Sequence, residues 1–314
     1  VTVTDKDGDT ATDSKNIGDK FIFKDDGPTI GTGSALSAAI VDESALVGGA
    51  RTPTDPDGAG PLPPYGTSAT IDVSGAFNPN YGTDGAGNVV KTLVVNGLVP
   101  TGLVDTLTGD AVVLTQVSGT VVEGRNSAGD VVFRITLSGN DVTLQQLRSM
   151  DHPLDGATNP DDSISLANGA LSLQGVITDG DGDTATHNIA MGDKFKFLDD
   201  GPMIATQAPT ANLQVSDADF SVNDSKNFAN AFTGIAYGTD GPAASNALVY
   251  GLSLSTQGVS SGLVDVLTGQ TIYLYRVGDV VYGQVGNNTG TYNPAGTNAF
   301  TISIDSTDAD ITLD

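Results

Sequence analysis

The chain has 314 residues, of which 38% are hydrophobic, so it is long enough to bury one large core or two ordinary ones. Its 38 acidic residues against 13 Lys and Arg give a formal net charge of -25, which repels nucleic acid and anionic lipid and excludes a polyanion-binding protein. With no Cys there is no disulfide framework or thiolate zinc site, and the apolar runs are too short for direct membrane insertion.

The acidic residues are almost all Asp, since Glu43 and Glu123 are the only two Glu. Asp is a poor helix former that suits turns and compact loops of oxygen ligands. The 40 Gly, the 14 Pro and the runs of Val, Thr and Ile predict many short strands joined by tight turns. The composition therefore predicts an all-β fold, with bound metal ions in place of disulfides.

The first element in chain order is one half of an internal repeat. Val3–Ile30 and Ile177–Ile204 agree at 18 of 28 positions at a constant offset of 174. Weaker echoes follow, with YGTDG at Tyr81 and Tyr237 and GLVD ending at Asp105 and Asp265. We therefore expect residues 1–30 to be the C-terminal part of one module, 31–204 a complete module and 205–314 the N-terminal part of a third, cut from a longer array.

Inside the complete module, four runs of alternating or β-branched residues predict strands, at Val89–Val95, Ala111–Val117, Val131–Leu137 and Ile164–Val176. Only Leu144–Met150 and Ser225–Phe232 suggest short helices, and Gly48–Tyr65, rich in Pro and Gly, is typical of a surface loop. Strands spaced by turns without amphipathic helices predict antiparallel β-sandwich modules in tandem.

The motif D-x-D-G-D occurs twice, at Asp5, Asp7 and Asp9 and again at Asp179, Asp181 and Asp183. Three carboxylates brought together by a turn repel one another, and Ca²⁺, which accepts roughly 6–8 oxygens at about 2.3–2.6 Å, removes that cost. The Gly and Glu that an EF-hand loop needs further on are missing, and no Cys is present for zinc. The alternative is that these Asp residues only form Asx-turns; the duplication of the triplet favours calcium.

The second motif, F-x-D-D-G-P-x-I, supplies Asp25 and Asp26 and again Asp199 and Asp200, where one module should hand over to the next. A calcium ion bound there by both modules would turn a flexible string into a stiff rod, and Mg²⁺ fits less well because it dehydrates reluctantly. A third acidic spot, Asp42 and Glu43, can supply further ligands. For four other residues turn formation is the expected role: Asp84, Asp105, Asp240 and Asp265.

A catalytic function is not expected. Gly258–Gly262 matches the literal pattern G-x-S-x-G around Ser260, but a nucleophile elbow needs a strand-to-helix turn and a later His, and no His follows. His152 and His187 each occur in one copy only. The sequence predicts a binding or structural protein.

The repeated motifs resemble the tandem modules of very large, type I-secreted bacterial RTX adhesins. The resemblance is carried by TDxDGDTAT, by the GDKFxFxDDGPxI joint, by SGLVDxLTG and by LQQLRSMDHP with its His152, and it spans nearly the whole chain. The joint also resembles the acidic linker of cadherins. The glycine-rich nonapeptide that names RTX proteins is absent.

This resemblance implies Ig-like or cadherin-like β modules at the bacterial cell surface, stiffened by calcium and supporting attachment and biofilm formation. The Asp residues of both motifs in both copies are implied calcium ligands. The modules' partners would be neighbouring repeats of the same polypeptide. Two roles stay open, an extender segment and a calcium-dependent module that binds a host or microbial glycan or a peptide terminus.

Overall fold

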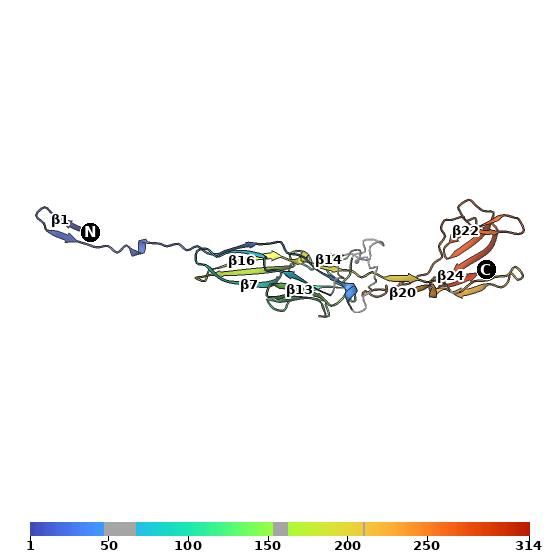
Figure 1. Ribbon diagram of the computed structural model, residues 1–314, viewed down its shortest axis with the longest axis horizontal. Helices are drawn as coiled ribbons and strands as arrows, with labels where there is room; N and C mark the ends of the chain where they lie inside the picture. Colours follow the sequence, from blue (N-terminus) through green and yellow to red (C-terminus); the bar gives the residue numbers. More distant parts are fainter. Residues whose placement is uncertain (47–66, 153–162, 210) are drawn as a thin grey trace.

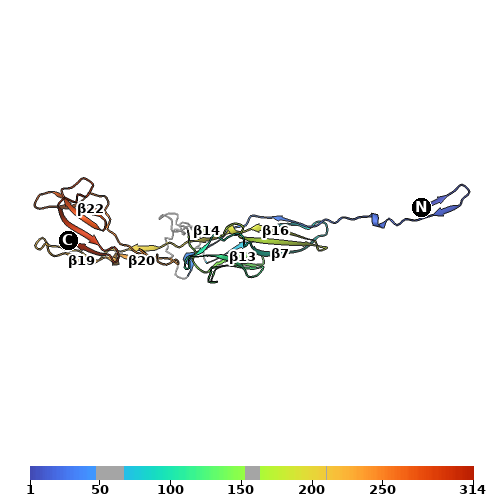
Figure 2. The same ribbon diagram turned by 180° about the vertical axis from the view of Figure 1, so that it is seen from behind.

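The computed structural model describes residues 1–46, 67–152, 163–209 and 211–314. They form an elongated, nearly all-β molecule in which an N-terminal segment, a central unit and a C-terminal unit follow one another along the long axis (Figure 1). The two chain ends lie at opposite ends of the molecule, as the view from behind also shows (Figure 2). The all-β prediction is confirmed. No helix in the described ranges is long and apolar enough to cross a membrane.

The central unit is a sandwich of sheets. One sheet has five antiparallel strands, in the order β10 (Val113–Gln116), β11 (Val121–Arg125), β12 (Val131–Ser138), β13 (Asp141–Gln146) and β5 (Ser68–Asp72). Across the core lie two three-stranded sheets: β16 (Thr184–Ala190), β15 (Leu171–Asp179) and β7 (Ala86–Val95); and β14 (Ser163–Ser165), β17 (Phe195–Leu198) and β4 (Ala39–Asp42). Two small pairs complete the unit: β3 (Thr29–Thr32) with β6 (Phe77–Asn80), and β8 (Val104–Asp105) with β9 (Asp110–Ala111).

The strands are held by alternation of buried and exposed side chains, as a two-sheet architecture requires. Along β15, every second residue from Leu171 to Asp179 is buried. In β12 the side chains of Phe133 and Ile135 are fully buried against the opposite sheets. One continuous hydrophobic core therefore fills the central unit.

The strand β17 closes this core. It lies between β14 and β4, with Phe195 and Phe197 fully buried and the ring of Phe197 5.3 Å from that of Phe133. Its pairing with β4 is parallel, which departs from the antiparallel pattern expected from the sequence. Because Leu198 pairs with Asp42, the chain leaves the unit directly beside Glu43.

The C-terminal unit repeats one sheet of the central unit. Its six strands run in the order β19 (Asp224–Asn227), β25 (Asp310–Leu313), β24 (Asn298–Ile304), β23 (Val280–Val285), β22 (Thr271–Val277) and β21 (Val259–Val264). The pair β18 (Met203–Thr206) and β20 (Phe232–Ala236) corresponds to β3 and β6. A second, smaller cluster of buried residues contains only Tyr250, Ile304 and Ala309.

The N-terminal segment is a hairpin of β1 (Thr2–Thr4) and β2 (Thr10–Thr12), followed by one 3₁₀ turn, η1 (Gly18–Lys20). Residues 1–27 are all exposed. Similar 3₁₀ turns are η2 (Glu43–Ala45), η4 (Gly192–Lys194) and η5 (Ala229–Ala231).

Three expectations about elements need correction or comment. The predicted helix at Leu144–Met150 is wrong, because Leu144 and Gln146 lie in β13, whose burial alternates with period two. The one at Ser225–Phe232 is wrong as well, since β19 is followed by only a 3₁₀ turn. The run Ile164–Val176 is split into β14 and β15 by a turn at Gly169, which has a φ of +86°. The loop predicted at Gly48–Tyr65 falls outside the described residues.

Candidate cation sites at the joints

The two D-x-D-G-D motifs form the same hairpin loop. The Oδ1 atom of Asp179 accepts hydrogen bonds from the backbone N–H groups of Gly182 at 3.1 Å and Asp183 at 2.8 Å. Asp5 does the same for Gly8 and Asp9, at 3.1 and 2.9 Å. One oxygen of the first Asp therefore shapes the loop, and the other oxygen is left for another partner.

The surroundings of the two loops differ. The triplet Asp5, Asp7 and Asp9 is exposed, although its carboxylate oxygens lie within 4.8 Å of one another. Asp179 is only 3% exposed, because its loop is pressed against the YGTDG turn of the central unit. A Cβ on Gly180 would lie 2.1 Å from the carbonyl oxygen of Asp84. Only a glycine permits this backbone contact.

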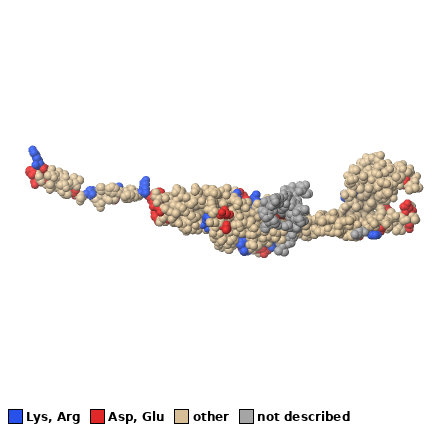
Figure 3. All heavy atoms as spheres, viewed as in Figure 1, with Lys and Arg blue, Asp and Glu red and all other residues tan. Residues whose placement is uncertain are grey.

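The N-terminal joint consists of Asp25 and Asp26, the turn that contains Thr83 and Asp84, and the loop 179–183. Its carboxylates form three overlapping groups whose oxygens lie within 4.8 Å of one another: Asp25, Asp26 and Asp84; Asp25, Asp181 and Asp183; and Asp84, Asp179 and Asp181. Figure 3 shows acidic side chains gathered where the N-terminal segment meets the central unit. Residues that are far apart in sequence thus meet in one acidic cluster.

Within the N-terminal joint, Thr83 anchors the linker. Its hydroxyl donates to Asp26 Oδ1 at 2.6 Å and its N–H to Oδ2 at 3.2 Å, which lowers the pKa of Asp26. Burial, followed by the charges of Asp25 and Asp26, raises the pKa of Asp84. The charge of Asp25 is the largest cause that raises the pKa of Asp183. The protein therefore spends free energy on keeping these carboxylates together without a counter-charge.

The C-terminal joint has the same linker geometry. It consists of Asp199 and Asp200, the turn with Thr239 and Asp240, and Glu43 and His152 of the central unit. Thr239 donates from its N–H to both oxygens of Asp200, at 3.0 and 2.9 Å, and from its hydroxyl to Oδ1 at 2.8 Å. The Thr hydroxyl–Asp contact is therefore repeated 174 residues after the Asp26 contact, and it ties each linker to the unit that follows.

Glu43 lies at the base of the C-terminal joint and is fully buried. Its Oε1 accepts from the Gln146 side chain at 2.7 Å and from the Met150 N–H at 2.8 Å. Its Oε2 accepts from the Thr239 hydroxyl at 3.3 Å, so the glutamate spans the two units. Burial raises the pKa of Glu43 to about 9, with Asp240, Asp199 and Asp200 adding to the shift.

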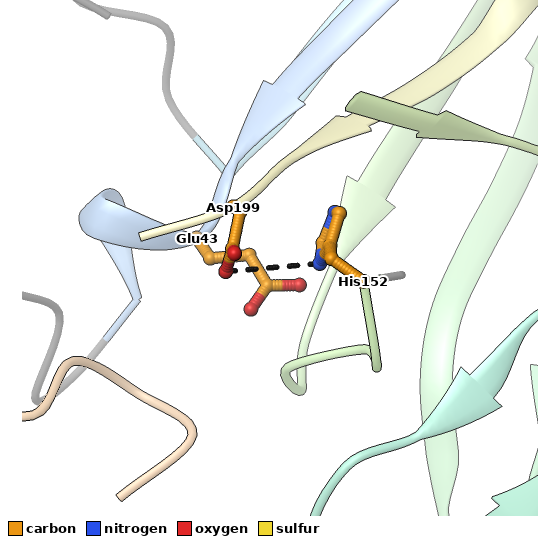
Figure 4. A group of neighbouring side chains, drawn as sticks. All are labelled: Glu43, His152 and Asp199. Atoms are coloured by element: carbon orange, nitrogen blue, oxygen red, sulfur yellow. Dashed lines mark ion pairs between the residues drawn. The ribbon is translucent and has the colours of Figure 1, made fainter. Parts of the chain in front are cut away.

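His152 faces Asp199 from the same side, and Figure 4 shows the ion pair between them. Nδ1 lies 3.7 Å from the Asp199 carboxylate and 2.9 Å from the Met150 carbonyl oxygen, while Nε2 lies 3.3 Å from the Phe197 carbonyl oxygen. Both ring nitrogens thus face acceptors, and only the imidazolium donates from both. Burial raises the pKa of Asp199 to about 6, against the opposing effect of His152. The histidine fits a counter-charge that orients the linker better than a metal ligand.

All the buried side-chain atoms without a hydrogen-bond partner in the described part of the chain belong to residues at or beside the joints. They are Asp179 Oδ2 at the N-terminal joint, and Gln146 Oε1, Asp240 Oδ1 and Thr106 Oγ1 at or beside the C-terminal joint. Burying a polar atom without a partner costs about 1–3 kcal/mol, so such atoms are rare. All four are oxygens, which is the donor set that hard cations take.

The predicted site residues are thus brought together in part. Asp25, Asp26 and the triplet 179–183 meet in one cluster, and Glu43 meets Asp199 and Asp200 in another. Asp5, Asp7 and Asp9 cluster only with one another. Asp42 Oδ1 accepts from the N–H and hydroxyl of Ser44 and caps η2, so this oxygen has a structural role.

Sequence reasoning missed several residues. Asp84 and Asp240 were expected only to form turns, yet both lie in the acidic joints. The duplicated YGTDG was the signal that could have found them. Gln146 carried no such signal. The turn role holds for Asp265, which accepts from the Thr268 N–H and hydroxyl, and Asp105 adds to its turn a buried ion pair with Arg148 at 2.9 Å.

Comparison with known proteins supports the repeat directly. One family model matches the chain twice, at residues 38–192 and 212–314, and the two matches begin 174 residues apart. The chain belongs to the DUF5801 family. That family is described as a domain of unknown function. No curated protein and no solved structure matches the chain. The two DUF5801 units therefore stand on their own geometry for any functional conclusion.

Proposed function

We propose that the chain is an extender segment of a large bacterial cell-surface adhesin, whose DUF5801 units are locked end to end by Ca²⁺ at acidic joints. The segment is extracellular, exported by a type I system, and supports attachment and biofilm formation by projecting a binding tip. It performs no chemistry of its own. The observation that carries the proposal is the pair of joints, in which each linker is fixed to the next unit by the same Thr–Asp contact.

The two joints support this proposal by displaying complementary parts. The N-terminal joint brings the linker pair together with the D-x-D-G-D loop and the YGTDG turn of the following unit. The C-terminal joint brings the equivalent linker pair together with Glu43 and His152 of the preceding unit. In an array each joint would have both parts, and the linker carboxylates would lie between two acidic surfaces.

Calcium fits these clusters better than other cations. The ligands are carboxylate, amide and hydroxyl oxygens, and Ca²⁺ tolerates irregular sets of roughly 6–8 of them. Mg²⁺ requires a strict octahedron and keeps its waters. Zinc prefers nitrogen and sulfur ligands, and the nearby histidine is occupied by carbonyl and carboxylate oxygens. An extracellular site of this kind binds at about 10⁻⁴–10⁻³ M, so a unit would stiffen only after export.

The test uses the full chain with Ca²⁺, with Mg²⁺ and with a chelator. At calcium one hundredfold above Kd, binding adds about 2.7 kcal/mol to the free energy of unfolding, which raises Tm by roughly 5–10 °C for units of this size. Solution scattering should show a longer, narrower distribution of lengths with calcium. A thermal transition and a scattering profile that both ignore calcium would overturn the proposal.

Matched variants locate the effect. Asp179→Asn removes the buried carboxylate at the N-terminal joint, while Asp5→Asn changes the same motif position in the exposed hairpin. The first variant should lose much of the calcium-induced rise in Tm and the second should retain it. Anomalous scattering from crystals grown in calcium would then place the ions.

A groove in the central unit favours a second candidate function. It has a volume of about 410 Å³ and is lined by Phe77, Lys91 and Asn140, among others, with the Lys91 ammonium donating to the Asn140 side chain at 2.6 Å. An aromatic edge beside a rare cation and an amide suits a glycan or a peptide carboxylate. Binding on a glycan or peptide array that is lost in Lys91→Ala would favour this ligand-binding role over a pure extender.

A further inference from the structure

The exposed N-terminal segment contains a strand without a partner. In the central unit, the segment Gly192–Leu198 forms η4 and β17 and buries Phe195 and Phe197 completely. Its counterpart begins with the same residues, GDKF, and carries Phe21 and Phe23 at the equivalent positions. These two side chains are 65% and 95% exposed. A segment that closes a core elsewhere in the chain thus has no core to close here.

The C-terminal unit lacks the matching strand. By the offset of 174, residues 213–216 are the counterparts of β4, which pairs with β17. They form no strand, and Val215 is 45% exposed where Val41 is fully buried. The inner face of the sheet is also uncovered, because Phe300 and Ile302 are partly exposed whereas the corresponding Phe133 and Ile135 are buried. The surface that β17 covers in the central unit is open here.

One chain cannot bring these two surfaces together. The N-terminal segment and the C-terminal unit lie at opposite ends of the molecule with the central unit between them (Figures 1 and 2). Each chain therefore carries a donor strand at one end and an open acceptor at the other.

We propose that the occupant of the open acceptor is residues 18–24 of a second copy of this chain. The donor pairs in parallel with residues 213–216, in the register that β17 adopts on β4. This register places Phe21 opposite Leu213 and Phe23 opposite Val215, as Phe195 lies opposite Ala39 and Phe197 opposite Val41. Both phenylalanines then cover Phe300, as Phe197 covers Phe133. The contact is an added strand with apolar anchors at alternate positions.

The resulting assembly is head-to-tail. Donor and acceptor are different surfaces, so the contact does not close into a symmetric dimer, and copies extend into an open chain. The counterparts of residues 145–175 lie in neither the donor nor the acceptor, so the sandwich is rebuilt in part and the association is reversible. This inference depends on apolar pairing and not on calcium, and it holds whether or not the proposed function is right.

The test measures the mass of the full chain by sedimentation velocity or light scattering across a dilution series, in calcium and in chelator. We expect the average mass to rise with concentration well beyond a dimer and to return to that of a single chain on dilution. Hydrogen exchange at residues 213–216 should slow in the concentrated sample. A single chain at every concentration, or unchanged exchange there, would overturn the proposal.

A pair of substitutions separates strand donation from general stickiness. The double variant Phe21→Lys with Phe23→Lys should remain a single chain at every concentration, and it should fold normally because both side chains are exposed in the free molecule. Ile22→Lys places at that position the residue that β17 carries, Lys196, and should associate as the wild type does. If Ile22→Lys abolishes association as fully as the double variant, the contact is unspecific and the inference is wrong.

Discussion

Two copies of almost one sequence, Val3–Ile30 and Ile177–Ile204, stand in different surroundings within this chain. In the second copy, β17 is a strand whose phenylalanines are fully buried. In the first copy the same residue types are extended without a strand and lie open to solvent. The difference shows that the hydrophobic alternation in this segment specifies a strand only when β4 and β14 offer edges to pair with.

The two DUF5801 units show the same dependence from the other side. Strand β7 pairs over its whole length with β15. The residues at the same distance after the second YGTDG, 242–251, form no strand, and the described C-terminal unit has no counterpart of β15. The five-stranded sheet, whose strands are all present in both units, forms in both. Each sheet is therefore a separate cooperative unit, and the second sheet depends on the closing segment.

The largest expected difference between the copies concerns their phenylalanines. Phe197→Ala removes a fully buried ring from the core and should lower the free energy of unfolding of the central unit by about 3–5 kcal/mol. Phe23→Ala removes an exposed ring and should change it by less than about 0.5 kcal/mol. Denaturant unfolding at high dilution, where chains are separate, compares the two. Equal losses would mean that the first copy is packed in solution.

The joint after the second copy should respond to pH in the absence of calcium. Glu43 has a pKa raised from 4.5 to about 9 and Asp199 one raised from 3.8 to about 6, so both groups bind protons more tightly in the folded state. Their stabilising contribution is complete below the unfolded values and is lost as pH rises, Glu43's through about pH 9 and Asp199's through about pH 6, at up to about 1.4 kcal/mol per pH unit for each group.

Thermal melts from pH 5 to pH 8 in chelator check this expectation, and the comparison variant is Glu43→Gln. The amide keeps the shape and the acceptor oxygen but does not titrate, so the fall in Tm should become shallower. Calcium competes with the protons, and its stabilising effect should therefore grow with pH. A wild-type Tm that rises over this range would contradict the assignment of Glu43 as a buried, protonated group.

The two D-x-D-G-D loops should differ in their response to charge removal. Without calcium, Asp179→Asn relieves repulsion within the acidic cluster and should raise Tm slightly, whereas with calcium it removes a ligand and should lower it by the equivalent of about 2–3 kcal/mol. Asp5→Asn should do neither, since the exposed hairpin carries no further carboxylates. Melts of both variants with and without calcium test the change of sign. The same sign in both conditions would argue against a bound ion at Asp179.

Much of this architecture could be predicted from the sequence, because it depends on local patterns. The repeat, the all-β fold and the acidic motifs follow from identities, alternation and turn residues. The parallel pairing of β17 with β4 could not, since more than 150 residues separate the two strands and neither carries a mark of its partner. The supposed helix at 144–150 failed because tertiary pairing with β12 and β5 outweighs the helix propensity of Leu and Gln.

The candidate site was predictable in the same uneven way. Asp25, Asp26 and Asp179 announced themselves by duplication. Asp84 and Asp240 were duplicated too, but a D-G pair is so common in turns that the turn explanation prevailed. Gln146 contributes an unpartnered oxygen only because the fold brings it beside Glu43, which no spacing in the sequence reveals.

The smallest expected effect concerns one position at which the copies differ, Gly180 and Lys6. Gly180 has no positive φ, so backbone strain does not require glycine there; the contact with the Asp84 carbonyl oxygen does. Gly180→Ala places a Cβ 2.1 Å from that oxygen and should separate the D-x-D-G-D loop from the YGTDG turn, at a cost of about 1–3 kcal/mol. The calcium-induced rise in Tm should shrink with it, because the ligands on the two loops move apart. Lys6→Ala, in the exposed hairpin, is the control and should leave both quantities unchanged. If Gly180→Ala lowers Tm but leaves the calcium response intact, the contact serves folding alone and the ligands of the N-terminal joint do not include both loops.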